Sequence, residues 1–373
     1  MPFRFLRWFT KTVIITINVI VGILFLGGAY ASDFNPERYW IMGLLTILLP
    51  VFILLLLLFL IFWVMIRPRW SLLSIAFLVL GWNAVKNILP IRLPYAFQMK
   101  KDSGVIRVMS WNVEQFAIQK LKKYPDRKQR ILDLINEYDP DIACLQEVVA
   151  GEETKSINNL NDINSRLKFR DYFYAYQLSN DFDRHHHFGT MIYSKYPIIH
   201  KQFVVNSPDN YNSTFQYIDV LIGKDTVRIF NAHLQSLRFS KENRNYLDRG
   251  EITTTAVRES GSIIRRIRRG ALRRAVQARE IKDVMNHTPY PVIMCGDFND
   301  VPVSYAYETI GRNMQNAFVK KGYGLSRTFN EISPTLRIDN IFADNHFVIE
   351  QFVRVKRILS DHYPVIADIR INE

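Results

Sequence analysis

The sequence predicts an α+β protein: a four-layer α/β sandwich, with two mixed β-sheets packed between outer helices, preceded by about three transmembrane helices. Long apolar runs fill the first 90 residues, and beyond residue 105 strand-like apolar runs alternate with a few helical patterns. Most of the short polar motifs in the chain come at or directly after a strand-like run. Many strands with few helices between them favour two packed sheets with helices outside.

The predicted membrane anchor, residues 1–90, contains three apolar segments: 12–31, 41–66 and 71–89. A spanning helix needs about 20 predominantly apolar residues, and the first two segments reach that length fully. The third is weaker because Asn83 and Lys86 interrupt its end. The first segment also fits a signal peptide cleaved after Ala29-Tyr30-Ala31, but its length and the two segments that follow favour a retained helix.

The basic residues around these segments predict their orientation. Arg4, Arg7 and Lys11 precede the first segment, Arg67 and Arg69 lie between the second and third, and the loop at 32–39 has no basic excess. The N-terminus and the 67–69 loop are therefore predicted to be cytoplasmic. Three crossings make this a multi-pass protein of the plasma (inner) membrane with an extracytoplasmic C-terminal domain. If the third segment lies only in the interface, that domain faces the cytoplasm.

Residues 91–104 form a predicted linker, and residues 105–373 form one domain of ordinary large size. Residues 127–138 are expected to be an amphipathic helix, because Ile131, Leu134 and Ile135 share one face. Gly223-Lys224-Asp225 predicts a hairpin turn. The predicted strands are 105–109, 142–145, 190–193, 215–222, 226–230, 291–295, 338–342, 348–355 and 365–369.

The chain is basic, with 48 Lys and Arg against 35 Asp and Glu and a net charge of +13. This excess suits polyanionic partners such as anionic lipid headgroups or nucleic acid, but it does not indicate a fold or a reaction. Eight arginines gather between residues 258 and 279, interleaved with aliphatic residues at helical spacing. Such a helix binds a membrane surface or nucleic acid, or it packs on the sheet by its aliphatic stripe; the second reading is slightly favoured.

Two residue groups raise a redox or metal alternative, and an ordinary explanation is favoured for each. Cys144 and Cys295 lie inside apolar runs, which favours buried thiols; a disulfide between them stays open, and neither has zinc-site spacing. His185-His186-His187 is a tempting metal motif. Because consecutive strand residues alternate faces, at most two of these imidazoles converge, and a solvated loop near the site mouth is favoured.

The functional information is concentrated in six polar motifs: Ser110-Trp111-Asn112, Gln146-Glu147, Ala232-His233-Leu234, Gly296-Asp297-Phe298-Asn299, Arg337-Ile338-Asp339-Asn340 and Ser360-Asp361-His362. Each places a carboxylate, a carboxamide or an imidazole where a strand delivers it to the rim of a sheet. Asp297 and Asn299 are two residues apart, so in an extended segment they point the same way. Oxygen donors with two imidazoles suit a hard divalent metal that assists attack on phosphorus, which predicts a phosphoesterase site.

In this order the motifs resemble those of the endonuclease/exonuclease/phosphatase superfamily, which has the DNase I-like fold. The resemblance spans about residues 105–370, and its most specific parts are the motifs at 296–299 and 360–362. It implies that residues 105–373 are a catalytic domain. It also implies a Mg²⁺ site, with Mn²⁺ as an alternative, at Asn112, Glu147 and Asp361.

The resemblance implies a role for each remaining candidate. Asp297 orients or deprotonates the attacking water, and Asn299 hydrogen-bonds the phosphoryl oxygens. His362 contacts the scissile phosphate, with Asp339 orienting its ring and favouring the imidazolium. His233 contributes to phosphate binding or to protonation of the leaving group.

The predicted function is that of a membrane-anchored, Mg²⁺-dependent phosphoesterase that hydrolyses phosphodiester bonds, with an endonuclease-like activity first. A phospholipid or sphingolipid phosphodiesterase and an inositol-phosphate phosphatase are alternatives, because fold does not choose among them. A catalytically silent, membrane-tethered binding module is the alternative of another class, and the complete set of site residues argues against it. A transporter is excluded because the apolar segments hold few ionisable residues. The expected partners are a phosphate-ester substrate (nucleic acid or lipid headgroup) and the bilayer; the sequence identifies no protein partner.

Overall fold

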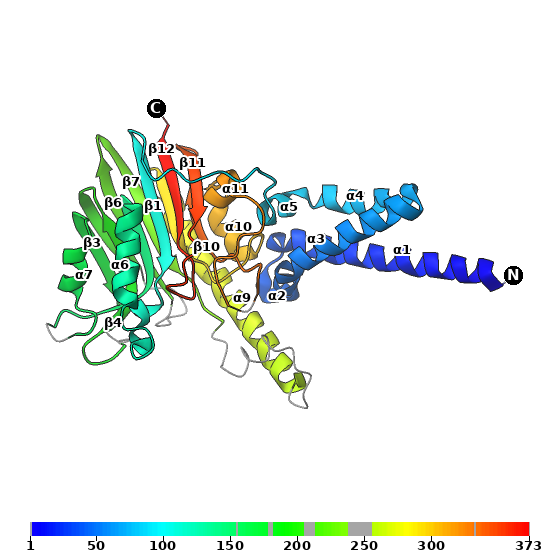
Figure 1. Cartoon of the computed structure of the whole chain (residues 1–373), viewed down its shortest axis with the longest axis horizontal. Coiled ribbons are helices and arrows are strands. Elements are labelled where there is room, and N and C mark those ends of the chain that lie inside the picture. The colour runs from blue at the N-terminus through cyan, green and yellow to red at the C-terminus, as the bar shows by residue number, and fades with distance from the viewer. Residues whose placement is uncertain are drawn as a thin grey trace.

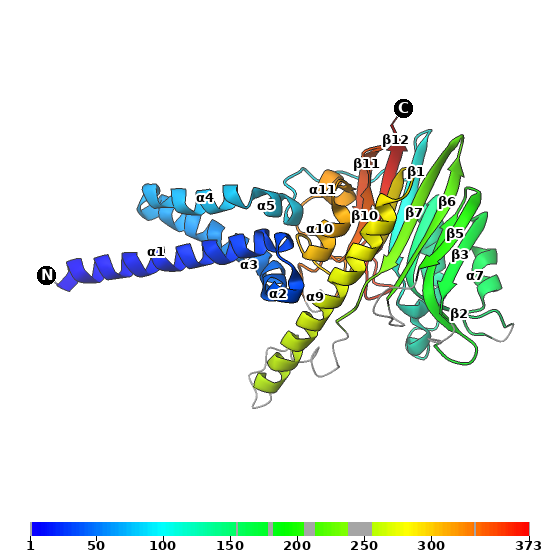
Figure 2. The same cartoon turned by 180° about the vertical axis from the view of Figure 1, so that it is seen from behind.

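The computed structural model describes residues 2–153, 156–177, 182–204, 213–237, 256–331 and 333–372. Two six-stranded sheets pack face to face and helices cover the outer face of each, with the apolar N-terminal helices projecting to one side (Figure 1). The view from behind shows the long helix α9 lying across the outer face of one sheet (Figure 2). The predicted four-layer architecture is confirmed.

The first sheet has the strand order β11-β12-β1-β2-β4-β3. Its strands are β11 (Phe347–Arg354), β12 (Val365–Ile371), β1 (Val105–Asn112), β2 (Ile142–Ala150), β4 (His187–Ser194) and β3 (Asp171–Tyr176). Only β1 and β2 are parallel; the other neighbours are antiparallel. All eight residues of β1 are buried, because the sheet is covered on both faces.

The second sheet has the strand order β5-β6-β7-β8-β10-β9. Its strands are β5 (Ile198–Val204), β6 (Thr214–Ile222), β7 (Asp225–His233), β8 (Val292–Asp297), β10 (Asp339–Ala343) and β9 (Gln315–Asn316). The central pair β7 and β8 is parallel and the other pairs are antiparallel. Each sheet therefore has one parallel pair near its middle, whose carboxyl ends share one edge.

Three apolar layers hold the four-layer domain together. The inner faces of the two sheets form one core, and Cys144 and Cys295 are both buried in it as free thiols, so there is no disulfide. Helices α6 (Arg127–Tyr138) and α7 (Leu160–Arg166) cover the first sheet, and α9 (Ala256–Asn286) and α10 (Tyr305–Gly311) cover the second. The short helix α11 (Ala317–Lys321) packs at β10 and β11, and the 3₁₀ segment η3 (Glu114–Lys120) follows β1.

Two N-terminal helices, α1 (Pro2–Ala29) and α3 (Ile41–Ile66), are long and apolar enough to cross a membrane. The short segments η1 (Ala31–Asp33), α2 (Pro36–Tyr39) and η2 (Pro68–Trp70) lie at their ends. The predicted third segment is broken into α4 (Ser71–Leu80) and α5 (Trp82–Ile88), bent by 72°, so there are three spans only if this pair counts as one. At the bend, a Cβ on Gly81 would meet the ring of Phe25 in α1 at 2.3 Å.

The helical N-terminal part is fixed against the domain by polar contacts. Arg337 donates to the Asn87 carbonyl (2.6 Å), Arg279 pairs with Glu37 (2.9 Å), and Val303 packs into the apolar cluster between the helices. The chain starts at the end of α1 that points away from the domain, and α5 lies beside the domain (Figure 1).

The segment at 91–104 is also attached to the domain, although it forms no helix or strand. The Tyr95 hydroxyl bonds both backbone groups of Phe352, and the Arg107 guanidinium donates to the carbonyls of Gln98 and Met99. These contacts limit how the domain can turn relative to the helices.

Candidate active site

The carboxyl ends of the two parallel strand pairs bring four of the predicted side chains to one place. Asn112 ends β1, His233 ends β7, Asp297 ends β8, and Glu147 lies on β2 one residue beyond the partner of Asn112. In the second sheet His233 pairs with Asp297, which pairs in turn with Asp339. The two sheets therefore each contribute one half of the site.

Glu147 projects from an irregularity in β2. The register between β2 and β4 shifts between Leu145 and Val148, and Glu147 has a φ of 50°. A β-bulge of this kind re-aims one side chain out of the regular alternation. As a result the Glu147 side chain is 19% exposed, whereas its strand neighbours are buried.

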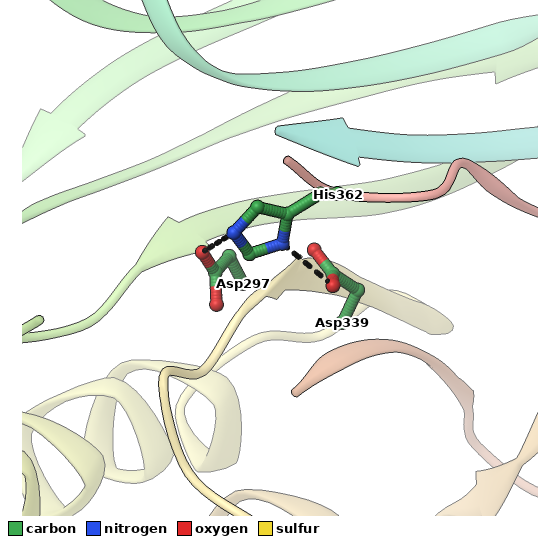
Figure 3. A group of neighbouring side chains, drawn as sticks. All are labelled: Asp297, Asp339 and His362. Carbon is green, nitrogen blue, oxygen red and sulfur yellow. Dashed lines mark hydrogen bonds and ion pairs between the residues drawn. The ribbon is translucent and has the colours of Figure 1, made fainter. Parts of the chain in front are cut away.

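His362 lies between two carboxylates, as Figure 3 shows: its Nδ1 is 2.9 Å from Asp339 Oδ2 and its Nε2 is 3.6 Å from Asp297 Oδ2. The backbone N–H of Asp339 donates to Thr328 Oγ1 at 3.0 Å, which fixes the end of β10. The ring of Phe329 lies with its centroid 5.0 Å from the imidazole. The ring of His362 is thus held from two sides.

The electrostatic surroundings favour a charged His362. Burial lowers the pKa of His362, but the carboxylates of Asp339 and Asp297 raise it more, and the net pKa lies well above the usual value. Burial also raises the pKa of Asp297, against the opposing effect of His362. A buried imidazolium with two acidic neighbours is a pre-organised donor for an anionic group such as a phosphate.

Among the described residues, Asp297, Asp339 and His362 form the one group whose ligand atoms meet the spacing of a metal site, all within 4.8 Å of one another. An imidazole must be neutral to bind a metal, and the raised pKa of His362 favours the imidazolium. Its hydrogen bond to Asp339 also occupies Nδ1. We therefore assign these three residues to a hydrogen-bonded unit instead of a metal site.

Of the predicted metal ligands, Glu147 and Asp361 line the cavity, and Asn112 is buried and does not. Burial raises the pKa of Glu147 to about 7, and the negative charge of Asp361 adds to this effect. Burial and Asp361 likewise raise the pKa of Glu114, which the sequence did not single out. Clustered, partly buried carboxylates repel one another, and a bound cation relieves that repulsion. Oxygen-only donors suit Mg²⁺.

Asn112 also connects this side of the site to the other. Its Nδ2 donates to Asp297 Oδ2 at 3.1 Å, and its Oδ1 accepts the N–H of Glu114 at 3.1 Å. The backbone carbonyl of Asn112 accepts the Ser360 hydroxyl at 2.7 Å, and that hydroxyl in turn accepts the N–H of His362 at 3.1 Å. The loop carrying Asp361 and His362 is thereby attached to the end of β1.

His233 is buried between the two halves, with Nε2 3.6 Å from both Glu147 Oε1 and Asp297 Oδ2. The segment after Asp297 is not extended as predicted. Asn299 has a φ of 49°, its N–H donates to Asp297 Oδ1 (2.9 Å), and its Nδ2 donates to the Leu234 carbonyl (3.1 Å). Both Asp297 and Asn299 nevertheless line the same cavity.

That cavity has a volume of about 480 Å³. The predicted residues on its wall are Glu147, Asp297, Asn299, Asp361 and His362, and Lys120, Arg274 and Phe329 lie beside them. Ile47 of α3 also lines it, although it is far from these residues in the sequence. The site is therefore bounded in part by the N-terminal helices.

A buried polar network behind the cavity joins the two sheets, and the sequence analysis missed it. Gln146 Nε2 donates to Asn231 Oδ1 (2.7 Å) and Ser110 Oγ (3.2 Å), and Asn231 Nδ2 donates to the carbonyls of Leu145 and Met191. Gln146 is thus a structural residue beside Glu147. Its partner Asn231 could have been found from the sequence, because it is an asparagine inside the apolar run before His233.

The other polar candidates lie elsewhere. His185 pairs with Glu153 and His186 with Asp183, and the ring of His187 stacks on Tyr176, so the three imidazoles do not converge. In α9, Ile263 and Ile267 are buried as the packing alternative expects. The helix also has arginines with specific partners: Arg274 bonds Asp300 at 3.0 Å, and Arg268 lies over the Trp40 ring.

Residues 109–362 match the sequence model described as the Endonuclease/Exonuclease/phosphatase family. Residues 11–88 match a second model, described as a Domain of unknown function (DUF8431). No curated protein matches the chain in sequence.

Several solved structures share the fold. An endonuclease/exonuclease/phosphatase from Beutenbergia cavernae DSM 12333 aligns with a TM-score of 0.54 at 18% identity, covering 72% of each chain. The D. rerio TDP2 complexed with single strand DNA product aligns at 0.52 and 15%, covering 72% of this chain and all of that one (100%). The human Nocturnin catalytic domain with bound sulfate anion aligns at 0.50 and 17%, covering 72% and 94%. At these identities the likeness supports the fold alone.

Proposed function

Because this chain belongs to the endonuclease/exonuclease/phosphatase family, we propose that it is a divalent-metal-dependent phosphodiester hydrolase anchored in a membrane. The observation that carries the proposal is the convergence of two groups on one cavity. Glu147 and Asp361 form an acidic side of its wall, with the buried Asn112 beside Glu147, and His362 with Asp297 forms a hydrogen-bonded side that the buried Asp339 supports through His362 Nδ1. Opposed groups of this kind bind a cation and an anionic phosphoryl group next to each other.

Each side has its own task in the proposed reaction. Mg²⁺, or Mn²⁺ in its place, would be held by Asn112, Glu147 and Asp361 and would supply Lewis-acid stabilisation of phosphoryl charge. Asp297 accepts hydrogen bonds from Asn112 and from the Asn299 N–H, which fixes its carboxylate for orienting or deprotonating water. Its pKa, raised by burial, brings its basicity closer to neutral pH.

The imidazolium of His362 donates to a phosphoryl oxygen and so stabilises the charge that develops in the transition state. Asp339 is a positioning residue, because its carboxylate accepts from His362 Nδ1. We assign Asn299 to phosphoryl binding. His233, buried between Glu147 and Asp297, is assigned to phosphate binding or leaving-group protonation.

We further propose that α1, α3 and the α4–α5 pair anchor the enzyme in the plasma (inner) membrane, with the domain outside the cytoplasm. The basic residues in the first turns of α1 and around residues 67–69 support this orientation. An endonuclease-like activity and hydrolysis of a lipid headgroup share this chemistry. The position of the cavity beside α3 bears on the choice between them, as argued below.

Hydrolysis of the soluble diester bis(p-nitrophenyl) phosphate by the full-length protein in detergent tests the reaction class. We expect hydrolysis in Mg²⁺ or Mn²⁺, loss of activity in a chelator, and recovery on adding the metal back. Full activity in the chelator contradicts the metal site, and absence of hydrolysis under all conditions contradicts the reaction class.

A further inference from the structure

An apolar helix forms part of the wall of the catalytic cavity. Ile47 of α3 lines the same hollow of about 480 Å³ as Glu147, Asp297 and His362. Helix α3 is one of the two helices that are long and apolar enough to cross a membrane. Once α3 is placed in a bilayer, the site opens at the bilayer surface.

A second hollow lies further along α3, between this helix and residues of the domain. It has a volume of about 250 Å³ and an almost entirely apolar wall that includes Pro50, Leu54, Leu57 and Leu325. A narrow hollow of about 20 Å³ lies between it and the catalytic cavity, sharing Ile47 with the catalytic cavity and Pro50 with the apolar one. The three hollows are therefore neighbours along α3, in a track that starts at the phosphoesterase residues and ends at the apolar surface of the helix.

The dimensions of α3 place this track in one leaflet. A helix of 26 residues is about 39 Å long, roughly 9 Å more than the hydrocarbon thickness of about 30 Å. With that excess at its N-terminal end, beside the domain, Ile47 lies at the hydrocarbon boundary and Leu54 about 10 Å below it. The apolar part of the track thus has the depth of an acyl chain, and the catalytic part lies at headgroup level.

Helix α9 adds positive charge at the same level. It is docked on the start of the anchor, since Arg268 lies over the ring of Trp40 and Arg279 pairs with Glu37. Arg265 and Arg269 of the same helix are exposed. Arginines at the surface of a bilayer attract anionic headgroups.

From this continuity we infer that the substrate is a membrane lipid with a phosphoester headgroup, which the enzyme takes directly from the bilayer. The headgroup occupies the catalytic cavity and an acyl chain lies along the Pro50–Leu57 side of α3. In the reaction a water oxygen bonds to phosphorus, one P–O ester bond breaks, and the departing oxygen takes a proton. The inference rests on the proposed hydrolase function and selects the lipid over nucleic acid.

Two substitutions on α3 separate lipid binding from catalysis. Leu54 lines the apolar hollow, whereas Ile61 is not among its lining residues, and their exposed fractions are matched at 56% and 57%. Leu54→Trp fills the hollow, and Ile61→Trp adds the same bulk away from it. Loss of burial for about two methylene groups, at roughly 0.8 kcal/mol each, corresponds to a decrease of about tenfold.

The test uses the full chain reconstituted with Mg²⁺ in vesicles of phosphatidylcholine and phosphatidylglycerol. Release of water-soluble phosphate ester or of diacylglycerol is measured beside hydrolysis of bis(p-nitrophenyl) phosphate and of single- and double-stranded DNA. We expect lipid hydrolysis, with the ratio of lipid to soluble-diester rates about tenfold lower in Leu54→Trp and unchanged in Ile61→Trp.

Intact lipid beside hydrolysed diester or DNA would overturn the inference and leave the proposed reaction standing. An equal rate ratio in both variants also overturns it, because the α3 track then has no role. If no substrate is hydrolysed in the presence of metal, the proposed reaction fails and the inference fails with it.

Discussion

Replacing Asp339 by Asn tests whether the charge beside His362 matters for catalysis. The substitution keeps the size of the side chain and an oxygen acceptor for the imidazole, and it removes one negative charge 2.9 Å from His362 Nδ1. At an effective dielectric constant of about 20 the attraction at that distance is on the order of 6 kcal/mol before the cost of burial. If only a quarter of that attraction, about 1.4 kcal/mol, is lost in the variant, the pKa of His362 falls by one unit.

The sign of the pH effect follows from the raised pKa values. Asp339 raises the pKa of His362, so the variant loses the imidazolium at lower pH than the parent does. Asp339 also raises the pKa of Asp297, so in the variant the Asp297 carboxyl loses its proton at lower pH as well. Both limbs of the pH–rate profile should shift to lower pH, the upper limb by at least about one unit.

At neutral pH we expect kcat to fall about 100-fold, because a donor to the developing charge is weakened. The assay is the pH dependence of soluble-diester hydrolysis by the full-length protein at saturating Mg²⁺. Asp283→Asn is the matched control, since Asp283 near the end of α9 lies 3.6 Å from His287 in an exposed pair. An Asp339→Asn profile with the rate and both limbs of the parent would refute the role of this charge.

Four further outcomes test other parts of the structure. Glu147→Gln should abolish hydrolysis and also Mg²⁺ binding, which is measured by calorimetry. The control Glu152→Gln changes an exposed acid five residues later and should keep both, and equal behaviour of the two variants contradicts the metal site. Because the pKa of Glu147 is raised to about 7, its carboxylate is protonated below that pH, so Mg²⁺ affinity should rise from pH 6 to pH 8; a flat titration contradicts the ligand assignment. Arg107→Met leaves the buried Asp368 carboxylate without its cationic partner, although Gln351 still donates to it, and thermal unfolding should reveal a loss of about 3–5 kcal/mol that Asp368→Leu in the same chain restores; no loss would mean that water reaches the pair. A reporter active only outside the cytoplasm, fused after residue 373, should give a signal; a signal from a cytoplasm-only reporter at that junction means two crossings instead.

The sequence predicts the rim of the site well, because strand periodicity and strand ends are local properties. The helix at 127–138 was predicted with its observed bounds, since its buried face repeats at helical spacing. Asn112, His233 and Asp297 each end a strand, which is where an apolar run followed by a polar residue places a side chain. Only the family pattern linked these ends to one another.

Edge strands and bends were harder to predict. Most successive residues of β5 are exposed, and β3 is half-buried on both faces. Neither strand therefore has the alternation of buried and exposed residues that indicates a strand in a sequence. The bend between α4 and α5 falls at Gly81, where the ring of Phe25 leaves no room for a Cβ, and these two residues are 56 positions apart in the sequence. The bulge that turns Glu147 outward depends on pairing with β4, again a contact without a local signal.

The candidate site takes Asn112 and Glu147 from one sheet and Asp297 and Asp339 from the other, so the distances between these side chains are set by contacts between the sheets. Asn112 reaches across to Asp297 (3.1 Å) and Gln146 to Asn231 (2.7 Å), both in buried surroundings. Buried polar groups are costly unless paired, and a pair constrains direction as well as distance, which apolar packing does not. The polar residues between the sheets thus fix the relative position of β1–β2 and β7–β8. The bonds from Arg337 to Asn87 and from Arg279 to Glu37 fix the domain on α3 and α5 in the same way. The candidate site, the sheet interface and the N-terminal helices are therefore parts of one arrangement, in which Ile47 lines the same cavity as Glu147 and His362 without being near them in the sequence.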